Sequence, residues 1–453
     1  MTQHSKYLWI KNPLAMLVDS QQDAGGGLVI SDGKIVELIA SGAVPNHYDT
    51  YYDAKDSVVL PGLINSHHHY YQTLTRAYPQ ALNQELFPWL QSLYPLWAGL
   101  EPNMLAAATK LALSELLLSG CTLSADHHYL FPNGMEDSID VQIEASKDLG
   151  MRTLFTRGSM SLGVDDGGLP PQSTVQTELQ ILEDSERLIH KYHQRGEGAM
   201  LQIALAPCSP FSVTPEIMKA SALLAEKLDV RLHTHLAETQ DEEAFCIRNF
   251  GLRTVDYLES VGWLSDRTWL AHGIHFNNTE IAQLGKAGVG VCHCPTSNMM
   301  LASGIARNLE MEAAGVPIGL GVDGSASNDG SNMIQEVRQA LYIQRLRYGS
   351  SKVTHFDAYR WATKGSATVL GRSDVGEIAV GKQADLALFK LDEMRFSGAH
   401  DPLAAILLCG AQRADRVMVA GQWKVKDSQL LSIDTEQLMA EHSALAKKLA
   451  AKM

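Results

Sequence analysis

The feature of this sequence that most constrains its fold is a long alternation of short apolar runs with amphipathic stretches. The apolar runs lie at residues 58–64, 121–124, 153–156, 201–205, 230–233, 269–272, 289–292 and 317–322. Such alternation is typical of parallel strands joined by crossover helices. Eight strands with helices between them predict an α/β fold, a (β/α)8 TIM-like barrel, in which catalytic groups sit at the carboxyl ends of the strands.

The segments before and after this alternation have the pattern of short β-strands instead. Before it, short apolar runs are separated by turns such as the Asp32-Gly33 step, and β-type patterns return at 376–389 and 416–425. We therefore expect the barrel to be inserted in a small discontinuous β-sandwich. The predicted domains are 1–58 (first part of the sandwich), 59–370 (the barrel) and 371–453 (second part plus a terminal helix). A chain of 453 residues, 45% of them hydrophobic, suits one large core and a smaller one.

A histidine cluster follows the first apolar run, after a Pro61-Gly62 break. On an extended segment, side chains two residues apart share a face, so His67 and His69 point the same way. Two imidazoles on one face can hold a metal ion. The alternative, a polar loop end that binds nothing, would fit an isolated cluster but not one with partners elsewhere in the chain.

Partners occur at two other predicted strand ends. His235 ends the fifth strand and Asp323 follows the eighth. Three imidazoles and one carboxylate suit one divalent metal, Zn2+ in preference to Fe2+, with room for a bound water. A metal of this kind lowers the pKa of its water from about 16 towards about 7. The sequence therefore predicts metal-dependent hydrolysis.

Two further residues are candidates for proton transfer. Glu238 follows His235 by three residues, a spacing that can place both side chains on one side of a turn. His272 ends the sixth strand of the same barrel. The alternatives are a helix N-terminal charge for Glu238 and a hydrogen-bonded core histidine for His272.

The charge balance limits the partners of the chain. A formal net charge of -14 would repel a nucleic-acid backbone or an anionic membrane surface, so a small molecule is the expected partner. The first twenty residues have no unbroken apolar run, because Lys11-Asn12-Pro13 interrupts them, and we expect no export signal. Six scattered cysteines suit reduced thiols in a cytoplasm.

Several of these segments together resemble a known family. They are Pro-Gly-Leu-Ile-Asn-Ser-His-His-His at 61–69, His-Leu-Ala-Glu-Thr at 235–239, Ala-His-Gly at 271–273 and Gly-Val-Asp-Gly at 321–324. The set is similar to the signature segments of the amidohydrolase superfamily, in its branch of aminohydrolases acting on purines, pyrimidines and triazines. The resemblance covers nearly the whole chain. It implies metal ligands at His67, His69, His235 and Asp323, proton-transfer and polarising roles for Glu238 and His272, and a proton-accepting role for Asp323.

Within that branch, the stretches 69–76, 157–163 and 323–332 resemble enzymes acting on oxidised purines. The expected reaction is hydrolytic deamination of 8-oxoguanine to urate and ammonia. By resemblance, Gln72 should hydrogen-bond the base, and the substrate-binding candidates are Gln72, Trp97, Arg157 and Cys208. The long aromatic segment 65–94 is expected to stack on the ring as a lid or pocket wall.

Two departures from relatives refine this expectation. Guanine deaminases carry an Arg-Phe pair after the fourth strand, where this chain has Ala206-Pro207-Cys208, which disfavours plain guanine. The same strand end lacks the lysine that bridges binuclear sites, so one metal is expected. Alternatives left open are a hydroxyatrazine-type triazine, guanine, isocytosine or an adenosine-type nucleoside as substrate, and a non-catalytic binding homologue. By analogy with other barrels we expect a homodimer.

Overall fold

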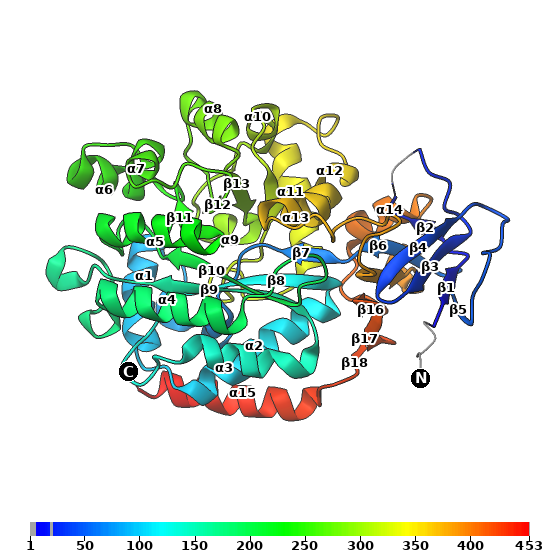
Figure 1. Cartoon of the computed structure of the whole chain (residues 1–453), viewed down its shortest axis with the longest axis horizontal. Helices are drawn as coiled ribbons and strands as arrows, with labels where there is room; N and C mark the ends of the chain where they lie inside the picture. The colour runs from blue at the N-terminus through cyan, green and yellow to red at the C-terminus, as the bar shows by residue number, and fades with distance from the viewer. Residues whose placement is uncertain (1–5, 19–20, 453) are drawn as a thin grey trace.

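Eight parallel strands form the centre of the computed structural model, which describes residues 6–18 and 21–452 (Figure 1). They are β7 (Leu63–Asn65), β8 (Cys121–His128), β9 (Arg152–Ser159), β10 (Leu201–Pro207), β11 (Leu232–Leu236), β12 (Thr268–His272), β13 (Gly290–His293) and β14 (Ile318–Leu320). Each strand pairs with the next one along the chain. The ring closes where the backbone N–H of Ser66 donates to the carbonyl of Leu320 at 2.9 Å and that of Asp323 donates to His67 at 3.1 Å. The predicted (β/α)8 barrel is confirmed.

The chain also forms α-helices, most of which cover the outside of this barrel. They are α1 (Leu86–Trp97), α2 (Pro102–Leu118), α3 (Ser138–Ser146), α4 (Glu178–Tyr192), α5 (Pro215–Leu228), α6 (Gln240–Phe250), α7 (Thr254–Ser260), α8 (Asn278–Ala287), α9 (Pro295–Met300), α10 (Asn308–Ala313), α11 (Met333–Tyr348), α12 (His355–Arg360), α13 (Ser366–Val369), α14 (Pro402–Ala405) and α15 (Thr435–Ala450). Starts and stops follow local chemistry: Thr177 and Asn277 form capping boxes at the starts of α4 and α8, and left-handed Gly251 and Gly288 end α6 and α8. None of these helices, over the part of the chain described, has the length and apolarity needed to cross a membrane.

Two further sheets lie beside the barrel (Figure 1). One has the order β4-β3-β1-β5 and the other β18-β17-β16-β15-β6-β2. Their strands are β1 (Leu8–Lys11), β2 (Ala15–Met16), β3 (Gly27–Ser31), β4 (Lys34–Ile39), β5 (Thr50–Asp53), β6 (Ser57–Pro61), β15 (Leu386–Lys390), β16 (Arg416–Val419), β17 (Gln422–Lys426) and β18 (Gln429–Leu430). A common core that includes Ile30, Val59 and Leu386 joins the two sheets. Strands from both ends of the chain therefore form one β-sandwich.

The first predicted strand differs from the observed one. Its apolar residues Val58 to Leu60 belong to β6, which pairs antiparallel with β15, and the barrel strand begins only at Leu63. Gly62 connects β6 of the sandwich with the barrel strand β7. A Cβ atom at this position would lie 2.1 Å from the Thr122 hydroxyl oxygen. Only glycine permits that close approach. The exact domain divisions at residues 58 and 370 stay predictions.

A buried ion pair connects the barrel with the sandwich. Arg152, at the start of β9, donates from Nε and Nη2 to the two carboxylate oxygens of Asp385 at 2.7 and 3.1 Å. Both side chains are buried, and Asp385 also accepts from the backbone N–H of Ala420 at 2.7 Å. A two-point contact of this kind fixes orientation as well as distance.

The segment between β7 and α2 closes one end of the barrel. It contains the short 3₁₀ turns Tyr70–Thr75 and Pro79–Ala81 and the helix α1. The terminal helix α15 packs along α2 and the first of these turns, where His442 Nε2 lies 3.0 Å from Thr73 Oγ1 (Figure 1). The segment that closes this end of the barrel therefore packs on the last helix of the chain.

Candidate active site

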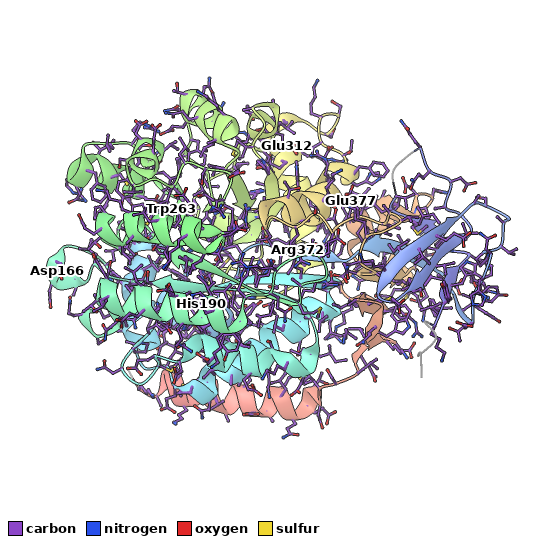
Figure 2. All side chains as sticks on the ribbon, in the orientation of Figure 1. Asp166, His190, Trp263, Glu312, Arg372 and Glu377 are labelled. Carbon is purple, nitrogen blue, oxygen red and sulfur yellow. The ribbon has the colours of Figure 1, made fainter. Side chains whose placement is uncertain are left out.

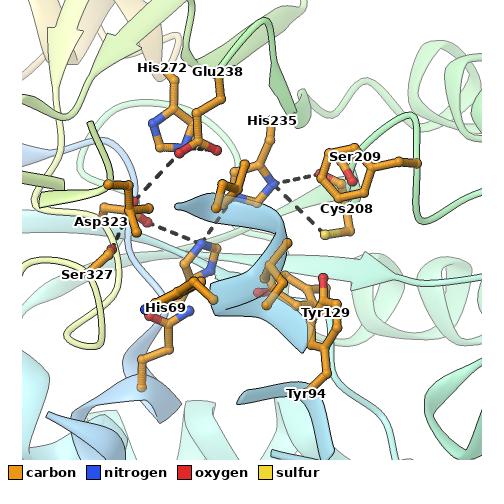
Figure 3. A pocket seen from close by; sticks show the side chains of 16 residues that line it. His69, Tyr94, Tyr129, Cys208, Ser209, His235, Glu238, His272, Asp323 and Ser327 are labelled. Carbon is orange, nitrogen blue, oxygen red and sulfur yellow. Dashed lines mark hydrogen bonds and ion pairs between the residues drawn. The ribbon is translucent and has the colours of Figure 1, made fainter. Parts of the chain in front are cut away.

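Four side chains from three strand ends converge at the carboxyl end of the barrel, and Figure 3 shows three of them, His69, His235 and Asp323. His67 and His69 follow β7, His235 lies in β11, and Asp323 follows β14. The Nε2 atoms of His67 and His69 each lie 3.3 Å from Asp323 Oδ1, and His69 Nε2 lies 3.1 Å from His235 Nε2. All four side chains are buried. The residues predicted as metal ligands are thus neighbours in space.

Backbone carbonyls set the protonation of two of these rings. His69 Nδ1 donates to the carbonyl of His127 at 2.7 Å, and His235 Nδ1 donates to that of Cys208 at 2.7 Å. Because a carbonyl only accepts, the proton of each neutral ring is on Nδ1 and the lone pair is on Nε2. Two lone pairs 3.1 Å apart repel each other unless a cation lies between them.

The third ring is set by another histidine. His233 Nδ1 donates to the carbonyl of Trp269 at 2.9 Å, which leaves its Nε2 as an acceptor for His67 Nδ1–H at 2.8 Å. The Nε2 of His67 is buried and has no hydrogen-bond partner. Burial lowers the pKa of His67 and that of His233 well below the usual value of a histidine, so both rings are neutral at pH 7.

Asp323 supplies the negative charge of this cluster. Its Oδ1 accepts from the backbone N–H of Gly324 at 2.7 Å, and its Oδ2 accepts from Ser297 Oγ at 2.6 Å. Three nitrogen lone pairs, one of them otherwise unpartnered, and one carboxylate oxygen form a donor set that fits a divalent metal ion.

Glu238 and His272 lie at the edge of the same cluster (Figure 3). His272 Nε2 is 3.4 Å from Glu238 Oε2 and 4.0 Å from Asp323 Oδ2. Asn298 Nδ2 donates to His272 Nδ1 at 3.0 Å, so the proton of the neutral ring is on Nε2 and faces the carboxylates. Burial raises the pKa of Glu238 well above its usual value and lowers that of His272 to about 4. One carboxylic acid and one neutral imidazole therefore face the metal-binding cluster.

Unusual backbone conformations place these side chains. Ala237, His272 and Asp323 have φ angles of 55°, 73° and 62°, in the left-handed region that costs non-glycine residues about 1–3 kcal/mol each. The turn at Ala237 is held by Glu242, whose buried carboxylate accepts from the backbone N–H groups of Ala237 and Glu238 at 2.8 and 3.2 Å. Strain of this kind collects at functional strand ends.

A small cavity lies over the cluster. Its floor is formed by His69, His235, Glu238, His272 and Asp323, and its roof by Gln72, Leu86, Trp89, Leu90 and Tyr94 from the 70–97 segment. The cavity has a volume of about 30 Å³ and is partly open to solvent. In this conformation it is tight for a heterocyclic base.

Two of the four substrate-binding candidates line this cavity and two do not. Gln72 and Cys208 are in its wall. Gln72 Oε1 accepts from the backbone N–H of Ala326 at 3.3 Å, and a Cβ at Gly324 would lie 1.8 Å from that oxygen. Glycine at 324 thus leaves the space that Gln72 occupies.

The other two candidates, Arg157 and Trp97, do not line this cavity in the structure. Arg157 points out of the barrel, where its Nε donates to Asp184 Oδ2 at 2.6 Å and its guanidinium covers the ring of Phe131. Trp97 lies behind the roof and donates from Nε1 to Thr75 Oγ1 at 3.1 Å, with its ring against Trp89, a roof residue.

Sequence reasoning missed several residues of the site. His127 was not singled out, yet its ring stacks on that of His235 at 4.7 Å and its Nε2 donates to the carbonyl of Ala206. The sequence also predicted no role for His233 in the site. Tyr129 and Ser327, which also line the cavity, gave no signal beyond a position near a strand end.

The chain matches known proteins over nearly its full length. The model of the amidohydrolase family matches residues 58–424. The 8-oxoguanine deaminase of Pseudomonas aeruginosa is 66% identical over 444 residues, covering 98% of this chain and 99% of that protein. An isoxanthopterin deaminase from an unknown prokaryotic organism is 33% identical, covering 92% and 90%. The crystal structure of an atrazine chlorohydrolase from Arthrobacter aurescens complexed with zinc has a TM-score of 0.92 and 33% identity, covering 97% and 100%. On this similarity, and with the expected strand-end residues gathered at one site, the chain belongs to the amidohydrolase family.

Proposed function

We propose that this chain is an aminohydrolase that converts 8-oxoguanine and water to urate and ammonia. The observation that carries the proposal is the 66% identity to an 8-oxoguanine deaminase over 98% of the chain. The site described above is compatible with that chemistry, because hydrolytic deamination needs an activated water and a proton donor next to a flat base.

The proposed cofactor is one divalent metal, Zn2+ in preference to Fe2+, held by His67, His69, His235 and Asp323. The donor set supports it, as does the zinc in the related chlorohydrolase structure. A metal bound there supplies Lewis acidity, which lowers the pKa of water from about 16 to about 7. A single metal is favoured because β10 ends in Ala206-Pro207, without a lysine to bridge two ions.

The protein residues handle the protons. Burial raises the pKa of Glu238 well above its usual value, which favours the carboxyl form that can give a proton to a ring nitrogen of the base. His272 carries its proton on Nε2, facing the cavity, and can hydrogen-bond a developing negative charge on the ring or on the attacking oxygen. Asp323 Oδ2 lies on the same side and can accept the proton of the attacking water.

The pocket walls are proposed to select the base. Gln72 and Cys208 are the two candidates from the sequence that line the cavity, and Trp89 and Tyr94 offer flat surfaces above it. An unpaired polar group buried with a wrong base costs about 1–3 kcal/mol, which is enough to discriminate between related heterocycles. The closed roof disfavours a nucleoside, because a ribose would need much more room.

The test is ammonia release from 8-oxoguanine, guanine, isocytosine and hydroxyatrazine, with zinc and iron measured in the same protein batch. We expect preferential turnover of 8-oxoguanine and about one metal per chain. The matched control is Glu238→Gln, which keeps every proposed metal ligand and should keep the metal while losing turnover. Metal present with all four compounds inert would refute the substrate, and equal activity of the variant would reveal a contaminating deaminase.

Two further expectations belong to this proposal. The composition, with six cysteines that form no disulfide, supports a reducing cytoplasm as the place of action. A homodimer is proposed by analogy with other barrels. A sedimentation mass near that of one 49.5 kDa chain would refute the dimer.

A further inference from the structure

A second cavity lies at the opposite end of the barrel from the active site. It is lined by residues that precede or begin β10, β11 and β12, among them Arg195, Asp229, Arg231 and Arg267. Because the strands are parallel, the amino ends of these strands are far from the carboxyl ends that carry the catalytic cluster. The cavity has a volume of about 240 Å³ and opens to solvent.

Positive charge is in excess around this cavity. Three guanidinium groups line it, and Asp229 is the one carboxylate among the lining residues. Arg267 Nη1 lies 2.8 Å from Asp229 Oδ1, and Arg195 Nη1 lies 3.5 Å from Asp229 Oδ2. Both of these arginines share Asp229, so the lining residues carry more positive than negative charge.

Arg231 is the arginine of the three that forms no ion pair, and the nearby charge of Asp266 is the acidic influence on it. No ion pair or hydrogen bond engages its guanidinium within the described part of the chain, and its Nε is fully enclosed. The ring of Trp269 also lies near it, with the ring centroid 5.9 Å from Cζ. Burial lowers the pKa of Arg231 to about 10, so the group remains charged at neutral pH. A largely buried, unpaired cation is unfavourable unless something else neutralises it.

A neighbouring arginine shows how the fold satisfies such a group elsewhere. Arg372, labelled in Figure 2, donates from Nε and Nη2 to the two oxygens of Asp374 at 2.8 Å each. It also lies within hydrogen-bonding distance of Gln202, which lines the cavity. Arg231 has the same kind of surroundings but lacks the carboxylate.

The local backbone leaves space for the Arg231 side chain. Gly371 follows α13 with a φ of 70°, and a Cβ there would lie 2.8 Å from Arg231 Nη1. Asp229 ends α5 with a φ of 49°, so its carboxylate is presented at the cavity mouth from a tight helix end. These features hold the guanidinium groups around one open space.

We propose that this cavity binds a phosphate group. A phosphate dianion would neutralise the excess positive charge, and its oxygens match the paired N–H donors of guanidinium groups. Free orthophosphate and the phosphate of a small phosphoester share this chemistry. The proposal is independent of the deaminase activity, because no residue of the cavity contacts the catalytic cluster.

The test is a calorimetric titration of the full-length, metal-loaded protein with sodium phosphate at low ionic strength. Arg231→Gln should weaken binding about tenfold or more, because it removes a charged donor. Asp229→Asn should strengthen binding about two- to fivefold, because it removes the competing carboxylate while asparagine tolerates the left-handed backbone. The control Arg248→Gln removes the same charge from an exposed site on α6 and should leave binding unchanged.

The opposite directions of the two cavity variants make the result decisive. A misfolded protein cannot bind more tightly, and phosphate that binds at the catalytic metal would not respond to either change. Ribose 5-phosphate in a second titration distinguishes the sources: tighter binding than orthophosphate indicates a phosphoester, and weaker binding indicates the free ion. No saturable phosphate binding by the wild-type protein, or equal binding by Arg231→Gln, overturns the proposal.

Discussion

The hydrogen bond from His67 to His233 should control metal affinity, and replacing His233 by alanine tests this. In the native structure the carbonyl of Trp269 accepts from His233 Nδ1, which makes His233 Nε2 the acceptor for His67 Nδ1–H. Without that acceptor, no hydrogen bond favours the His67 tautomer that carries its proton on Nδ1. The tautomer with a proton on Nε2 cannot bind a metal through that atom.

The expected size of the effect follows from the position of His233. It touches one of the four proposed ligands and leaves the carbonyl contacts of His69 and His235 intact. Loss of a hydrogen bond that orients a ligand typically costs about 10- to 100-fold in metal affinity, or about 1.4–2.7 kcal/mol. We therefore expect zinc affinity to fall within that range, with glutamine at 233 less harmful than alanine because its amide oxygen can accept from His67.

The assay is competition for zinc between the protein and a chromophoric chelator at pH 7. His128→Ala is the matched control, since His128 is also a buried histidine at the end of a barrel strand but contacts no proposed ligand. Both variants lose stability through the cavity they create, but only the His233 variant should lose zinc affinity. Equal zinc affinity of His233→Ala and wild type would refute the tautomer argument.

Three further expectations can be checked with single variants. Glu242→Gln should lower kcat about tenfold with little change in KM, because the turn that places Glu238 loses part of its support; unchanged steady-state kinetics would contradict this. Arg157→Ala should lower the free energy of unfolding in urea by about 3 kcal/mol, since it breaks a largely buried pair with Asp184, but leave KM unchanged; a large rise in KM would restore Arg157 as a substrate ligand. Burial raises the pKa of Glu336 to about 7. Between pH 4.5 and 7 the folded state therefore binds a proton that the unfolded state has lost, so the free energy of unfolding falls as pH rises through that window. Glu336→Gln should reduce this fall by up to about 3 kcal/mol in urea unfolding at pH 5 and 7, and an equal fall in both proteins would count against the assignment.

The sequence predicted the catalytic cluster because strand ends are recognisable without knowing the fold in detail. His67 and His69 are two residues apart after an apolar run, and Asp323 follows another, so a parallel barrel necessarily brings them to one end. What the sequence could not show was the direction of side chains within a strand. All eight residues of β9 are buried, so no alternation of polar and apolar positions reveals that Arg157 points outward.

Long-range pairing explains the remaining differences. The run that begins at Val58 reads as one strand, yet it is divided between two sheets because β15, over 300 residues away in the sequence, pairs with its first half. The role of His233 depends likewise on a contact with a residue 166 positions away. Such contacts leave no periodic signal in the sequence around either residue.

The barrel separates the chemistry of the site from its selectivity. Backbone carbonyls and His233 hold the three imidazoles, and these contacts do not involve the side chains of the roof. The side chains of Gln72, Trp89 and Tyr94 line the cavity and belong to one segment that packs on α15. Because these side chains line the cavity, they are the part of the segment that a bound base would contact. Substitutions in the roof should therefore alter the choice of base and the rate of turnover while zinc affinity stays the same.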